Sequence, residues 1–116
     1  MRAADSTTTV LDISQLRNIT LDDEDLMREI VSALVEDASH QIDILRQAVE
    51  RADAQECARV AHSARGACGN VGAASLAALF SAVEQSAKGG DLTVAGNALR
   101  SLCDELEKLR EEACTI

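Results

Sequence analysis

Apolar residues recur at steps of three and four positions through most of the chain, which is the period of an α-helix that buries one face. The longest stripe predicts a helix that begins just after residues 20–22 and ends near Arg51. Thr20 or Asp22 is its expected N-cap, and the acidic residues of positions 22–25 suit the positive end of a helix dipole. Its expected core positions are Leu26, Ile30, Leu34, Ala38, Ile42, Leu45 and Val49.

Four further helices follow from the same periodicity. A short one covers positions 12–19, and a third runs from Ala54, behind the N-cap Asp53, to about Gly69. A fourth covers positions 73–88 and stops at Gly89-Gly90, which supply left-handed geometry, and a fifth starts near Asp91. Their expected apolar contacts are Leu11, Leu16 and Ile19 on the first, Leu76, Leu79, Phe80 and Val83 on the fourth, and Leu99, Leu102, Cys103, Leu106 and Leu109 on the fifth.

Short loops between long helices force neighbouring helices to run antiparallel. The predicted fold is therefore all-α, an antiparallel up-down four-helix bundle with a short additional N-terminal helix. We expect residues 10–116 to form this single domain and residues 1–9 to be a flexible leader, since MRAADSTTT is too polar for a signal peptide.

Composition supports a helical protein and narrows its partners. The 116 residues include no proline, tryptophan or tyrosine and a single phenylalanine, while the formal net charge is −9. Nucleic acid is an unsuitable partner, because phosphate backbones attract basic surfaces. No apolar run approaches the roughly 20 residues that span a bilayer. We expect a cytoplasmic, monomeric protein.

Four cysteines raise the question of a metal site or a disulfide. The spacings CxxC and CxxH do not occur, so we expect reduced thiols and no bound metal. Cys57, Cys68 and Cys103 fall on apolar helix faces, where a free cysteine acts as a small hydrophobic residue. Cys114 is expected to be exposed in the tail, where it could form adventitious dimers.

His62 lies opposite the apolar stripe of its helix. At 100° per residue from His62, the apolar positions fall between about 140° and 260°. These positions are Cys57, Val60, Ala61, Ala64, Ala67, Cys68 and Val71. His62 is therefore predicted to face solvent.

Glycine and arginine surround this histidine. Gly66 and Gly69 follow it by one and two turns, so one flank of the imidazole is left open, and Arg65 places a cation within a turn of the ring. A largely neutral imidazole can attack phosphorus through Nε2, and arginine can pair with the transferred oxygens. The pattern indicates a phosphoryl acceptor, although an unremarkable surface histidine is the alternative.

The same residues resemble the signature of the histidine-containing phosphotransfer (HPt) domain. That signature has a histidine, a lysine three residues later, an adjoining glycine, and a small-polar run that leads to Asn-hydrophobic-Gly-Ala. The corresponding residues are His62, Arg65, Gly66, the run of positions 67–69, and positions 70–73 (NVGA). Leu76 and the pair Val83-Glu84 also resemble the family's next helix. Arg65 departs from the more common lysine, which keeps the charge but replaces a flexible point charge with a planar fork.

The resemblance implies a phosphorelay intermediate within an antiparallel four-helix bundle. His62 would accept a phosphoryl group from a receiver-domain aspartate or a histidine kinase and pass it to another receiver aspartate. The receiver would supply Mg²⁺, and this chain would bind no cofactor. No P-loop is present, so we expect a carrier and not an ATP-using enzyme.

Docking residues are expected around His62, namely Gln55, Ala58 and Arg59, with exposed aliphatic positions near Met27 and Val31. His40 matches nothing in the motif and is interpreted as a polar-face residue. Two other functions stay open. One is a non-catalytic adaptor or inhibitor that binds a receiver or kinase. The other is metal-assisted chemistry by His40, His62 and acidic side chains, for which no ligand motif exists.

Overall fold

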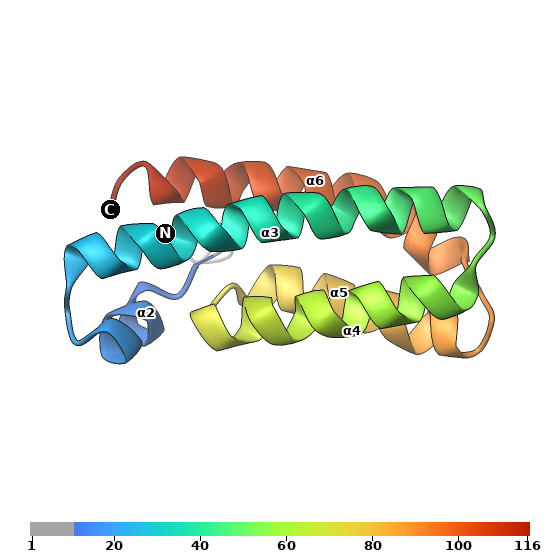
Figure 1. Ribbon diagram of the computed structural model, residues 1–116, viewed down its shortest axis with the longest axis horizontal. Coiled ribbons are helices and arrows are strands. Elements are labelled where there is room, and N and C mark those ends of the chain that lie inside the picture. Colours follow the sequence, from blue (N-terminus) through green and yellow to red (C-terminus); the bar gives the residue numbers. More distant parts are fainter. Residues whose placement is uncertain (1–10) are drawn as a thin grey trace, which may run out of the picture.

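The computed structural model describes residues 11–116. All regular secondary structure within these residues is α-helical (Figure 1). The helices are α2 (Ile13–Thr20), α3 (Glu24–Glu50), α4 (Ala54–Val71), α5 (Ala74–Lys88) and α6 (Thr93–Ala113). The all-α prediction is confirmed. The predicted leader at positions 1–9 lies outside the described residues.

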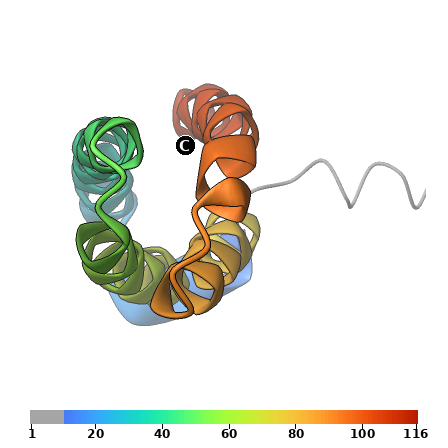
Figure 2. The ribbon, with the colours of Figure 1, turned by 90° about the vertical axis from the view of Figure 1, so that its right-hand side faces the viewer.

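The four long helices form an antiparallel bundle in which sequence neighbours pack side by side. α3 packs on α4, α4 on α5 and α5 on α6, and α6 returns to α3 (Figures 1 and 2). The end-on view of Figure 2 shows the four helices in this order around the bundle. The connections are only a few residues long, as the sequence predicts.

The core consists of aliphatic stripes from every helix around Phe80, which is fully buried. Alanine fills many of the remaining positions, so that the helices approach one another closely. The buried alanines are Ala38, Ala48, Ala61, Ala64, Ala73, Ala87, Ala95 and Ala98.

The start of α3 differs from the prediction. Its N-cap is Asp23, whose side chain accepts a hydrogen bond from the Leu26 amide, because Leu21 and Asp22 adopt left-handed conformations that lengthen the turn. The buried stripe consequently starts at Met27 and continues through Val31, and Leu26 is exposed. Met27 and Val31 themselves are therefore core residues, whereas the neighbouring Leu26 is an exposed aliphatic position of the kind expected there.

Two other expected core positions, Ile19 and Cys103, are also wrong. Ile19 is half-exposed, and the buried Thr20 hydroxyl instead donates to the Leu16 carbonyl at 2.8 Å. Cys103 is exposed, because the buried face of α6 is centred on Leu102, Leu106 and Leu109.

The cysteines are all free. Cys57 and Cys68 are buried as predicted, and burial raises the pKa of the Cys68 thiol to about 12. Cys114 is exposed, as expected from its place in the tail.

α2 fixes the C-terminal end of α4. Gly72 ends α4 with a φ of 99°, and its carbonyl accepts a hydrogen bond from the Asp12 amide at 2.8 Å. The Gln15 side chain donates to the carbonyls of Gly69 at 3.0 Å and Asn70 at 3.3 Å. The last turn of α4 is therefore anchored from outside the helix.

Candidate functional site

The His62 side chain projects from α4 away from the core and is 66% exposed. Residues on the opposite face of α4 are buried, as the helical projection predicts. They are Cys57, Val60, Ala61, Ala64 and Cys68. The prediction that His62 faces solvent is therefore confirmed.

A carboxylate from α5 lies against the ring of His62. The Nδ1 atom is 2.8 Å from Oε2 of Glu84, whose side chain is only 4% exposed. Glu84 occupies the buried side of α5 beside Phe80, Val83 and Ala87. A carboxylate in such a position needs hydrogen-bond donors to offset its desolvation.

Two cations complete the pairing of Glu84. The Arg65 Nε atom donates to Oε1 at 3.0 Å, and the Lys88 Nζ atom donates to Oε2 at 3.1 Å. Burial raises the pKa of Glu84, but the hydrogen bonds from His62, Lys88 and Arg65 outweigh burial and lower it to about 2. Glu84 is therefore ionised at neutral pH.

The ionised carboxylate determines the tautomer of His62. An unprotonated Nδ1 would place its lone pair against Oε2 at 2.8 Å, so Nδ1 must carry a proton that it donates to Glu84. Arg65 Nη2 lies 3.2 Å from Nδ1; because both groups are then donors, this contact is only a close approach of the guanidinium to the ring. In the neutral ring, Nε2 is left with its lone pair available.

Gly66 and Gly69 leave empty space on the same face of α4. A Cβ atom built on either glycine would meet no atom within 4 Å. Nothing within the described residues thus requires glycine at these two helical positions. The predicted clearance beside His62 is present as open space.

A groove of about 510 Å³ begins at Arg65 and follows this cleared face toward α2. Small side chains and glycine backbone form most of its walls. The lining residues are Asp12, Gln15, Arg65, Gly66, Gly69, Asn70, Gly72, Ala74, Ala77, Ala78 and Ser81.

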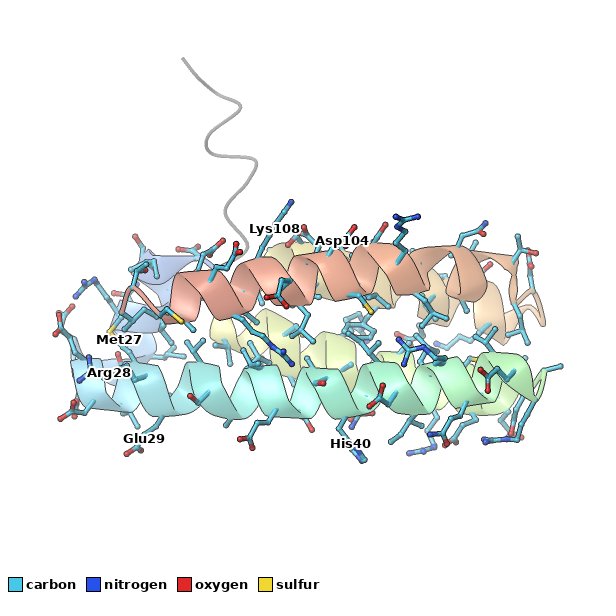
Figure 3. All side chains as sticks on the ribbon, turned by 90° about the horizontal axis from the view of Figure 1, so that it is seen from above. Met27, Arg28, Glu29, His40, Asp104 and Lys108 are labelled. Atoms are coloured by element: carbon cyan, nitrogen blue, oxygen red, sulfur yellow. The ribbon has the colours of Figure 1, made fainter. Side chains whose placement is uncertain are left out.

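The three predicted docking residues lie on α4 before His62. Gln55 and Arg59 are exposed, and Ala58 is half-buried against the core. The Arg59 guanidinium binds both oxygens of Glu56, each at 2.7 Å, so its charge is already paired within α4. His40 is exposed on the edge of α3 that faces away from α6 (Figure 3).

Sequence reasoning did not include Glu84 and Lys88 among the site residues. A detectable signal exists, because Glu84 interrupts the apolar stripe of Phe80, Val83 and Ala87. A carboxylate within such a stripe is rarely buried unless it is paired.

Within residues 11–116, no group of three or more histidine, cysteine or acidic side chains could hold a metal ion. In the same part of the chain, no helix combines the length and apolar character that a membrane span requires.

Comparisons with known proteins agree with this geometry. No curated protein matches the sequence. Among solved structures, the chain is similar to histidine-containing phosphotransfer protein B (HptB) from Pseudomonas aeruginosa PAO1, with a TM-score of 0.84 and 27% identity. That similarity covers 91% of this chain and 92% of the Pseudomonas chain. The Hpt domain family matches residues 29–112, and the chain therefore belongs to the Hpt domain family.

Proposed function

We propose that His62 carries a phosphoryl group between proteins of a two-component phosphorelay. Nε2 accepts the group from an aspartyl phosphate of a receiver domain, or from a histidine kinase, and a second receiver aspartate removes it. The observation that carries this proposal is the 2.8 Å contact between Nδ1 and Glu84, because it leaves Nε2 as an exposed nucleophile.

The transfer needs no proton to leave the ring. The Nε2 lone pair forms the bond to phosphorus while the bond from phosphorus to the aspartyl oxygen breaks, and the electron pair of that bond departs with the carboxylate. The imidazole then carries positive charge and still holds its Nδ1 proton. Glu84 stabilises this charge as it develops, and it is already in place before the reaction starts.

Arg65 and the glycines prepare the other side of the reaction. The Arg65 guanidinium is next to the ring and can pair with the phosphoryl oxygens. Gly66 and Gly69 give a partner protein room to bring its aspartate in line with Nε2. Mg²⁺ and most of the remaining charge stabilisation come from the receiver domain, so this chain acts as a phosphocarrier.

The proposed docking face is the His62 side of α4 with the adjoining groove. Gln55, Ala58 and Arg59 extend it toward the start of α4, and the groove extends it toward α2. A cytoplasmic location fits this role, because the four free cysteines suit a reducing compartment.

Phosphotransfer from purified receiver domains tests the proposal. Receivers loaded with acetyl phosphate are expected to give this chain a label that is acid-labile and alkali-stable. His62→Gln should abolish the label and keep the helical circular dichroism spectrum, while His40→Gln serves as the matched control and should keep the label. Full labelling of His62→Gln would refute the proposal, and equal receiver binding by both variants without any phosphate would identify an adaptor.

A further inference from the structure

The Glu84 carboxylate has more partners than its single charge requires. It accepts hydrogen bonds from His62, Arg65 and Lys88, so the network of one carboxylate, two cations and a neutral ring has a net charge of +1. The transfer proposed above uses only two of these partners, the ring and the arginine. Lys88 has no assigned part in it.

We propose that Lys88 is a positioning residue for the phosphorylated state, in which it keeps Glu84 paired while Arg65 turns from Glu84 to the phosphoryl group. This inference rests on the proposed function of His62. It assigns each of the two cations its own place after transfer, Arg65 on the phosphoryl oxygens and Lys88 on the carboxylate.

The negative charge of a phosphoryl group on Nε2 attracts the Arg65 guanidinium. A phosphoryl group brings about −1.5 to −2 charge near neutral pH. The Arg65 side chain is 41% exposed, and its Nη2 atom is already 3.2 Å from the imidazole. A planar guanidinium can bind two phosphoryl oxygens at once. Its present contact with Glu84 is weaker, because Arg65 donates to the carboxylate through Nε alone.

If Arg65 moves to the phosphoryl group, the buried Glu84 carboxylate loses a hydrogen-bond donor. Oε1 of Glu84 would lose its 3.0 Å hydrogen bond inside a site where the side chain is 4% exposed. A buried acceptor without a donor opposes the change. Another hydrogen-bond donor must therefore replace Arg65 at Glu84 when Arg65 moves.

Lys88 is placed to be that donor. Its Nζ atom already contacts Oε2 at 3.1 Å, one helical turn from Glu84, and its flexible side chain is 62% exposed. In the proposed phosphorylated state its ammonium group bridges the two carboxylate oxygens. Lys88 is also the last residue of α5, where the helix dipole favours a cation.

The equilibrium of phosphotransfer between a receiver and this chain tests the inference. Lys88→Gln should shift the equilibrium toward the phosphorylated receiver by ~2- to 5-fold, a modest effect because the lysine is partly solvated. The matched control is Lys108→Gln, which removes another exposed lysine, one that pairs with Glu105 on α6 at 3.1 Å. The control should leave the equilibrium unchanged, and neither variant should change the helical content of the unphosphorylated protein.

A double-mutant cycle separates this role from a general effect of charge. In a Glu84→Gln background no carboxylate needs pairing, so Lys88→Gln should have little further effect. Equal effects in both backgrounds, or no difference between Lys88→Gln and Lys108→Gln, would overturn the inference and leave the proposed function intact. Absence of label on the unaltered chain would instead overturn the proposed function itself.

Discussion

Replacement of Gly66 by alanine is expected to make the protein more stable and a poorer phosphoryl acceptor. Gly66 lies inside α4, five residues before the helix ends at Val71, and its φ is not positive. A Cβ atom there would meet nothing within 4 Å, so alanine adds no strain. The helix preference of alanine over glycine then applies in full, about 1 kcal/mol.

This gain is measurable by urea or thermal unfolding. For a domain of this size, 1 kcal/mol corresponds to a rise in Tm of about 4 °C. Gly72→Ala provides a control of opposite sign, because Gly72 has a φ of 99° and a Cβ atom there would lie 3.1 Å from the Asp12 carbonyl oxygen. That variant should lose about 1–2 kcal/mol of stability.

The rate of phosphotransfer should change in the other direction. The added methyl group of Gly66→Ala occupies space beside His62 that a receiver domain needs, and a displacement of about 1 Å can slow transfer by ~10- to 100-fold. The assay compares single-turnover transfer from a phosphorylated receiver to each variant. A less stable Gly66→Ala protein would refute the open-space argument, and a stabilised protein with an unchanged transfer rate would refute the clearance argument.

Other predictions concern the carboxylate, the core and a helix cap. Glu84→Gln should slow phosphotransfer by about tenfold or more, because an amide does not neutralise the charged ring; single-turnover rates equal to those of the unaltered chain would contradict this. The pKa of Glu84 is lowered from 4.5 to about 2, so its ionisation contributes stability that is complete above pH 4.5 and is lost as the pH falls toward 2. Urea unfolding over this pH range should therefore show a steeper loss for the unaltered chain than for Glu84→Gln, and identical slopes would argue against the pairing. Phe80→Ala removes a fully buried ring and should cost about 3–5 kcal/mol in thermal unfolding, whereas a loss below 1 kcal/mol would mean that the core collapses around the gap. Asp53→Ala removes the cap that accepts a hydrogen bond from the Glu56 amide at 3.1 Å, and should cost about 1 kcal/mol in the same assay unless water replaces the bond.

The sequence predicted the helices and the outward direction of His62 because both depend on local periodicity. α4 begins at Ala54 behind Asp53, as expected, and it ends two residues beyond the predicted Gly69. Five of the seven apolar positions opposite His62 are buried, and the other two, Ala67 and Val71, are partly buried against the core. Such features need no knowledge of which helices are neighbours.

The errors and omissions arise where the outcome depends on the turn geometry or on packing between helices. Two consecutive left-handed residues, Leu21 and Asp22, move the N-cap of α3 to Asp23, and no glycine marks this turn. Glu84 joins His62 only because α5 packs on α4 with one particular rotation, and a single helical projection does not contain that rotation. The pairing of Glu84 with Lys88, by contrast, is an i,i+4 contact within α5, which the sequence spacing could have indicated.

The atom of His62 that bears phosphorus is the most direct test of the central claim. Protein labelled with ¹⁵N at histidine can be phosphorylated by a loaded receiver domain and analysed by ¹⁵N–³¹P and ¹H–¹⁵N correlation spectra. The predicted result is phosphorus on Nε2 of His62, with Nδ1 still protonated against Glu84. Phosphorus on Nδ1, or on His40, would contradict the account.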